Sequence, residues 1–135
     1  MPQVALLDDR SSAAEDEIRA QVLGLLTALY PRNDLLERRH DNRYPFPSLI
    51  HLTPVGKDGH SAEGATVVVV GKHLSEHGFS FYHQAPLPYR RMIASLEGRR
   101  GQWVGFLIDL KWCRFSKGGW YESGGRFLQT VLAQP

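Results

Sequence analysis

The stretch ATVVVVGKHLSEHGFSFYHQ, residues 65–84, predicts two strands joined by a tight turn. Its four consecutive valines favour extended backbone, because β-branched side chains suit a pleated surface. The segment SEHG places Ser75 first in a four-residue turn and Gly78 fourth, where a type I turn favours glycine. The aromatic run FSFYHQ then predicts the returning strand. A connection this short makes the two strands antiparallel neighbours.

Apolar runs alternate with turn residues on both sides of this stretch and predict about six strands in all. The other predicted strands are PSLIHLTPV (47–55), YRRMIASLE (89–97), GQWVGFLIDLKWCRF (101–115) and WYESGGRFL (120–128). The polar, glycine-containing connections between them are VGKDGHSAEG (55–64), GRRG (98–101) and SKGG (116–119). Many short strands in one small chain indicate an antiparallel barrel or sandwich. The tail QTVLAQP (129–135) fits a short helix or coil.

The longest predicted strand has two faces that differ in polarity. One parity carries Val104, Phe106, Ile108, Leu110 and Trp112, and the other carries Gly105, Leu107, Asp109, Lys111 and Cys113. Successive side chains of a strand point to opposite faces, so the first set is expected in the core and the second on a wetter surface. The three tryptophans are expected to pack the barrel, although one exposed aromatic near a group of arginines could also stack on bases.

A helix is expected before the strands, at about residues 12–29. Ser12 and Glu15 have the spacing of a capping box, and an apolar face recurs at helical intervals. Tyr30 precedes Pro31, which disfavours further helix. We expect an N-terminal helical segment at residues 1–36 and a barrel domain at residues 37–135.

The bulk composition is that of an ordinary globular protein. The chain has 135 residues, 42% hydrophobic and 22% charged, with a formal net charge of +2. This small net charge argues against a general nucleic-acid binder. No apolar run approaches the roughly 20 residues of a membrane-spanning helix, and the N-terminus has no basic region typical of a signal peptide. We expect a cytoplasmic protein with neither a nucleic-acid nor a membrane partner.

The usual signatures of catalysis and metal binding are missing from the sequence. There is no nucleophile elbow, phosphate-binding loop or dinucleotide fingerprint. Asp109 is a single carboxylate with no evident partner, and the lone Cys113 is expected in the core or on the surface. His73 and His77 flank a predicted turn and no further ligand completes a metal set. We therefore expect no enzyme, no metal and no cofactor.

Three arginines gather just before the first strand. The stretch ERRHDNRYPFP, residues 37–47, contains Arg38, Arg39 and Arg43. Arg39 and Arg43 can converge in either helix or strand, and guanidinium groups suit both phosphates and the O6/N7 edge of guanine. Taken alone, the cluster also fits a solvated surface with acidic neighbours.

Read together, the arginine cluster and the stretch GKHLSEHGFSFYHQAPLP (71–88) resemble the PilZ domain family, over about residues 37–128. The closing segment YESGGRFL (121–128) is similar to the last strand of that family. The resemblance implies a six-stranded antiparallel β-barrel in a bacterial cytoplasmic receptor for cyclic di-GMP. By position it implies ligand contacts from Arg38, Arg39, Arg43, His73, Ser75 and Gly78.

His73 departs from the PilZ pattern, which has Asp or Asn at this position. A carboxylate or amide oxygen can accept paired guanine N–H donors, whereas a neutral imidazole offers one acceptor nitrogen. Two functions follow from the resemblance. The chain is either a cyclic di-GMP receptor that signals to a regulated partner protein, or a degenerate PilZ-like interaction domain that binds no nucleotide.

Overall fold

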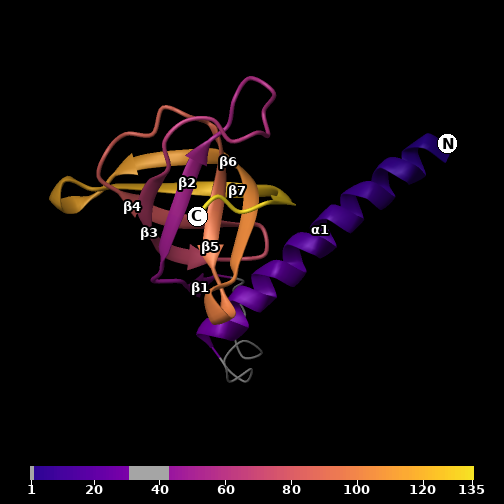
Figure 1. The fold of residues 1–135 in the computed structure, drawn as a ribbon, viewed down its shortest axis with the longest axis horizontal. Helices are drawn as coiled ribbons and strands as arrows, with labels where there is room; N and C mark the ends of the chain where they lie inside the picture. The colour runs from indigo at the N-terminus through magenta and orange to yellow at the C-terminus, as the bar shows by residue number, and fades with distance from the viewer. Residues whose placement is uncertain (1, 31–42) are drawn as a thin grey trace.

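The structure is a computed structural model of the chain. It describes the backbone of residues 2–30 and 43–135, and the side chains of residues 13–30 and 43–135. Within these described residues one α-helix precedes seven strands (Figure 1). The elements are α1 (Pro2–Leu29), β1 (Tyr44–Pro45), β2 (Leu49–Pro54), β3 (Val67–Leu74), β4 (Gly78–His83), β5 (Arg91–Glu97), β6 (Trp103–Phe115) and β7 (Tyr121–Val131).

Six of the strands close into an antiparallel barrel. Their hydrogen-bonded order is β3-β2-β5-β6-β7-β4, and β4 pairs again with β3. Every pairing is antiparallel. The predicted six-stranded barrel with an N-terminal helix is therefore confirmed. The two-residue strand β1 is added where Tyr44 and Pro45 pair with Leu74 and His73 of β3.

The barrel and the helix share one hydrophobic core. Ile18, Val22, Leu25 and Leu26 of α1 belong to the same buried cluster as Phe81, Phe106 and Ile108 of the barrel, among others. The C-terminal half of α1 lies against the barrel, and the N-terminal half projects away from it (Figure 1). The Tyr30 hydroxyl donates a 2.6 Å hydrogen bond to the carbonyl of Pro45, which ties the end of the helix to β1.

The helix begins earlier than the sequence predicts. It starts at Pro2, so Ser12 lies inside the helix and the predicted capping box with Glu15 is wrong. Proline suits the first helical position, where its missing N–H is not needed, and no further proline or glycine interrupts residues 3–12. The predicted end at Leu29 is correct. No helix among the described residues is both long and apolar enough to cross a membrane.

The outer face of β6 is less exposed than its alternation predicts. Leu107 and Asp109 are both buried, so the expectation of a wetter face is wrong for this half of the strand. Leu107 lies opposite Ile93 of β5, which is also buried. Beyond β7 the tail is coil and crosses this face, where the Gln134 amide donates a 2.7 Å hydrogen bond to the Ser95 hydroxyl.

A bulge in β6 explains why Trp112 leaves the core face. Leu110 pairs with Gly125 and Trp112 pairs with Gly124, so Lys111 is an extra residue without a partner in β7. One extra residue reverses the alternation that follows it. Trp112 is 44% exposed and lies over Gly124, where an added Cβ would collide with the indole ring. The expectation that Trp112 packs inside the barrel is therefore wrong.

The docking of α1 can be tested with two leucines of the same helix. Leu25 is 2% exposed in the core, whereas Leu23 is 57% exposed. We expect Leu25→Ala to lower the free energy of unfolding by about 2–5 kcal/mol, because it leaves a cavity. Leu23→Ala is the matched control and should change it by less than about 0.5 kcal/mol. Urea unfolding followed by circular dichroism measures both, and equal effects would show that α1 does not pack as described.

Candidate functional site

Two bulges border one region of the barrel surface. In β3 the register shifts between Gly71 and His73, which leaves Lys72 as the extra residue. In β6 the extra residue is Lys111. Bulges re-aim side chains and are frequent beside functional sites. Here each bulge adds a lysine to the wall of the same cavity.

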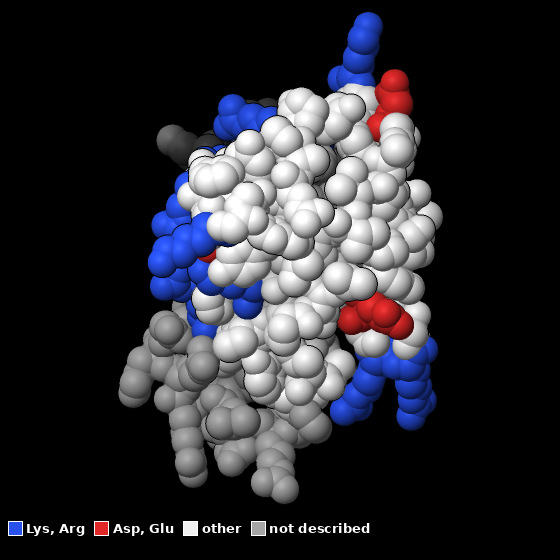
Figure 2. Space-filling view, turned by 90° about the vertical axis from the view of Figure 1, so that its left-hand side faces the viewer, with Lys and Arg blue, Asp and Glu red and all other residues white. Residues whose placement is uncertain are grey.

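The cavity is open and basic, and its volume is about 800 Å³. It lies over β3, β4, β6 and β7 and is lined by both polar and aromatic side chains, among them Arg43, Lys72, His73, Ser75, Gly78, Lys111, Trp112, Arg114, Glu122 and Arg126. Among these described residues Glu122 is the one acid. In the face shown by Figure 2, lysine and arginine side chains gather along one side of the barrel, with little acidic surface between them. The arrangement favours an anionic ligand.

The turn between β3 and β4 is held by the Ser75 side chain. The Ser75 amide donates to the Gly78 carbonyl at 2.9 Å, and the Gly78 amide donates back to the Ser75 hydroxyl at 3.3 Å. The His77 amide also donates to that hydroxyl at 3.3 Å. A Cβ on Gly78 would collide with the carbonyl oxygen of Gly125 in β7. Glycine is therefore needed here for the approach of β4 to β7, and the predicted turn is confirmed.

The strand pairing brings together side chains that are distant in the sequence. Because Pro45 of β1 pairs with His73 of β3, Arg43 arrives beside the end of β3. Arg43, His73, Ser75 and Gly78 all line the cavity. The other two residues predicted for the site, Arg38 and Arg39, lie outside the described residues. The positions of the four described residues agree with the predicted grouping, while the binding itself stays a prediction.

Glu122 is a buried carboxylate in the cavity and holds two cations. It accepts hydrogen bonds from Lys72 Nζ and Arg114 Nη2, both at 2.6 Å. Burial on its own would raise the pKa of Glu122, but these hydrogen bonds outweigh it, so the pKa lies below its ordinary value. The hydrogen bond to Glu122 in turn raises the pKa of Lys72. Glu122 therefore stays ionised and positions both cations in the cavity wall.

Trp112 forms an aromatic surface beside these charges. The Arg114 guanidinium lies 5.4 Å from the centre of the indole ring, in cation–π contact. An exposed indole beside guanidinium and ammonium groups can stack on a planar base while the cations meet a phosphate. Sequence reasoning did not place Lys72, Lys111, Trp112, Arg114, Glu122 or Arg126 in the site. Gly124, which leaves space under Trp112, was the signal in the sequence.

Asp109 has partners that its sequence position did not reveal. It accepts hydrogen bonds from Lys111 Nζ at 2.8 Å and Arg90 Nε at 2.9 Å, so this single carboxylate is ion-paired. The hydrogen bond from Lys111, which outweighs burial, holds the pKa of Asp109 below its ordinary value. Arg90 is distant in the sequence, whereas Lys111 lies two residues away on the same predicted face of the strand.

The other chemical candidates do not assemble into a site among the described residues. These residues contain no group of three His, Cys, Asp or Glu side chains that could hold a metal ion. His77 is exposed and lies 3.5 Å from the Glu76 carboxylate. Cys113 is an exposed thiol on β6.

Comparisons with known proteins identify no family. No family model matches the chain, and no curated protein matches it. Among solved structures, the chain is similar to the Bacillus subtilis inhibitor of motility, MotI/DgrA, with a TM-score of 0.47 and 11% sequence identity. That similarity covers 70% of this chain and 44% of the other, so the chain matches less than half of that protein's length. A similarity this distant assigns neither a family nor a function.

The ion pairs of Glu122 make a prediction about acid stability. The folded-state pKa of Glu122 lies below its ordinary value of 4.5, so the unfolded chain binds this proton more readily. The contribution of ionised Glu122 to the free energy of unfolding is therefore present above about pH 4.5. It is lost as the pH falls through the lower, folded-state pKa. At pH 7 we expect Glu122→Gln to cost about 1–3 kcal/mol of unfolding free energy, since charged hydrogen bonds are weakened.

The difference between parent and Glu122→Gln should shrink as urea unfolding is repeated from pH 7 down to pH 3. Glu97→Gln, which changes an exposed carboxylate outside the cavity, is the matched control and should follow the parent at every pH. A constant difference between parent and Glu122→Gln across this range would contradict the assignment.

Proposed function

We propose that this protein is a cyclic di-GMP receptor module of bacterial second-messenger signalling. The observation that carries the proposal is the convergence of Arg43 with the Ser75–Gly78 turn on one open basic cavity. These residues come from the two sequence elements that resemble the PilZ domain family. The resemblance supplies the identity of the ligand, and the charge and volume of the cavity are consistent with it.

The chemistry of the cavity suits a dianionic nucleotide with two flat bases. Arg43 and the lysines at the bulges offer donors to phosphate oxygens, and guanidinium can also meet the O6/N7 edge of guanine. Trp112 offers a stacking surface at the cavity wall. Ser75 has a hydroxyl at the rim, although that oxygen already accepts from the turn amides.

A receptor of this kind would signal through the joint between the arginine element and the β3–β4 turn. Binding there would contact Arg43, which leads into β1, together with the Ser75–Gly78 turn. The ligand-bound surface would then be read by a regulated partner protein. Such a module performs no reaction, and ligand occupancy alone shifts its conformational population.

The role of Arg43 can be measured by calorimetric titration with cyclic di-GMP. We expect Arg43→Ala to weaken binding by about 1.5–3 kcal/mol, the range for hydrogen bonds to charged groups. Arg99→Ala removes an exposed arginine from the turn before β6, outside the cavity, and should bind as the parent does. If Arg43→Ala binds as tightly as the parent, the nucleotide site is elsewhere or absent.

A second function is favoured by His73, which lines the cavity where the PilZ pattern has an acceptor of paired donors. A protein that cannot hold guanine at this position would be a PilZ-like interaction domain without nucleotide. If the imidazole is the obstacle, His73→Asp should strengthen cyclic di-GMP binding by roughly 1–3 kcal/mol, the value of a good paired contact to a base.

If His73 is protonated when the ligand binds, His73→Asp has the opposite effect on affinity. Measurements at two pH values distinguish this case from the previous one. An imidazolium could meet a phosphate, and imidazole has an ordinary pKa of about 6.5. Parent affinity would then rise between pH 8 and pH 6, and His73→Asp would weaken binding. Titrations of parent and variant at both pH values distinguish the cases. If neither protein binds at either pH, the receptor hypothesis is rejected and the PilZ-like interaction domain without nucleotide is the function that stands.

A further inference from the structure

The hairpin between β6 and β7 reaches beyond the body of the barrel. The last β6 residue that pairs with β5 is Asp109, and β4 ends at His83, opposite Tyr121. Beyond Asp109, β6 has lost its β5 partner but stays paired with β7 as far as Phe115 and Tyr121. Past the His83–Tyr121 pair the chain turns at Lys117–Gly119, which projects from one end of the barrel in Figure 1. We refer to residues 111–121 as the β6–β7 tip.

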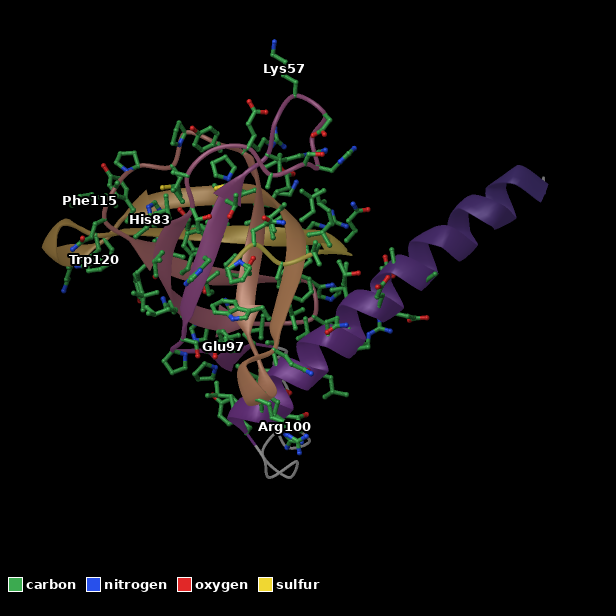
Figure 3. The ribbon with its side chains drawn as sticks, in the orientation of Figure 1. Lys57, His83, Glu97, Arg100, Phe115 and Trp120 are labelled. Atoms are coloured by element: carbon green, nitrogen blue, oxygen red, sulfur yellow. The ribbon has the colours of Figure 1, made fainter. Side chains whose placement is uncertain are left out.

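The β6–β7 tip exposes large aromatic surface. Phe115 is 69% exposed, and its ring meets Tyr121 edge-on at 5.5 Å. Trp112 is also exposed, and Trp120 is half-buried. Figure 3 shows both Phe115 and Trp120 at the projecting end. Exposed apolar side chains that gather in one place, rather than singly, mark an interaction surface.

The charge of the same tip has one sign. Lys111, Arg114 and Lys117 fall within residues 111–121, and this stretch contains no acidic residue. Lys111 and Arg114 are partly neutralised by Asp109 and Glu122, whereas Lys117 stands at the turn itself. The basic cavity continues this field along the barrel side. The surface that covers the tip should therefore be anionic.

The shape of the tip distinguishes between the two surfaces that could cover it, a partner protein and a lipid bilayer. A specific protein interface buries about 800 Å² on each partner, whereas the projecting turn Lys117–Gly119 is three residues long. A bilayer interface needs no matching concavity and admits a narrow convex element. Aromatic rings prefer the headgroup level of a bilayer, and each basic residue near an anionic leaflet adds attraction.

We propose that the β6–β7 tip is a contact site for the surface of an anionic membrane. Phe115 inserts at the headgroup boundary, Trp120 lies at the same level, and Lys117 meets lipid phosphates. This contact is peripheral and requires no spanning segment. Phe115 and Lys117 do not line the cavity, so their membrane contact can be tested without cyclic di-GMP, although Lys111, Trp112 and Arg114 of the same tip do line it.

Vesicle flotation of the full chain tests this contact without nucleotide. The parent should float with vesicles of phosphatidylcholine and phosphatidylglycerol at low salt and remain unbound with phosphatidylcholine alone. We expect Phe115→Ser to weaken binding about tenfold, through loss of buried apolar surface. Lys117→Gln should weaken it about fivefold, the effect of one basic residue near the membrane, and added salt should weaken it further.

The chain offers a matched control for each variant. Leu132 is 84% exposed on the C-terminal tail, so Leu132→Ser removes apolar surface elsewhere. Lys57 lies in the loop between β2 and β3, away from Phe115 (Figure 3), so Lys57→Gln removes a charge elsewhere. Both controls should float as the parent does. All four positions are exposed, so thermal unfolding should be unchanged and can be checked directly.

The single cysteine supplies a second readout. Cys113 is exposed on the tip, so an environment-sensitive dye attached to it should shift to the blue when anionic vesicles are added. Absence of vesicle binding by the parent, equal binding to neutral vesicles, or full binding by both tip variants would each overturn the proposal. Binding of single-stranded RNA by the parent that Phe115→Ser abolishes, with no vesicle binding, would assign the tip to nucleic acid instead.

Discussion

Strand β7 is the constraint on which the rest of this structure depends. It is hydrogen-bonded to β6 on one side and to β4 on the other, and these pairings convert an open sheet into a barrel. Closure removes the unpaired strand edges that invite association. It also requires backbones to approach closely, which is why β4 has Gly78 where an added Cβ would collide with the Gly125 carbonyl oxygen of β7. The core, the cavity and the projecting hairpin all depend on the pairing of β7 with β6 and with β4.

Much of the fold could be predicted because its strands and turns are local features of the sequence. The valine run of β3, the Ser75–Gly78 turn and the glycine-containing turn before β6 each specify their own conformation. The start of α1 was misplaced because Ser12 and Glu15 have a capping pattern in a segment that is already a good helix former. The bulge at Lys111 was not predictable, since one extra residue changes no composition and is set by pairing with β7.

The candidate site also contains residues that the sequence could indicate and residues that depend on strand pairing. His73, Ser75 and Gly78, which lie close together in the chain around one turn, were expected in the site from the resemblance, and all three line the cavity. Lys72, Arg114 and Glu122 could not be assigned, because they meet only through the register of β3, β4, β7 and β6. Position in the sequence gives no sign that Glu122 is the carboxylate between two cations. A site formed by neighbouring strands is hidden from sequence reasoning until the register is known.

The dependence of the cavity on β7 also has a consequence for folding order. The walls of the cavity come from residues 43–80 and residues 111–126, so their contacts join distant parts of the chain. Contacts of this kind form slowly, because long loops must close before any contact energy is gained. During synthesis, the segment from Arg43 to Ser80 emerges well before its partners. An emerging chain therefore cannot hold the nucleotide proposed above until β7 has been made and has joined β4 to β6.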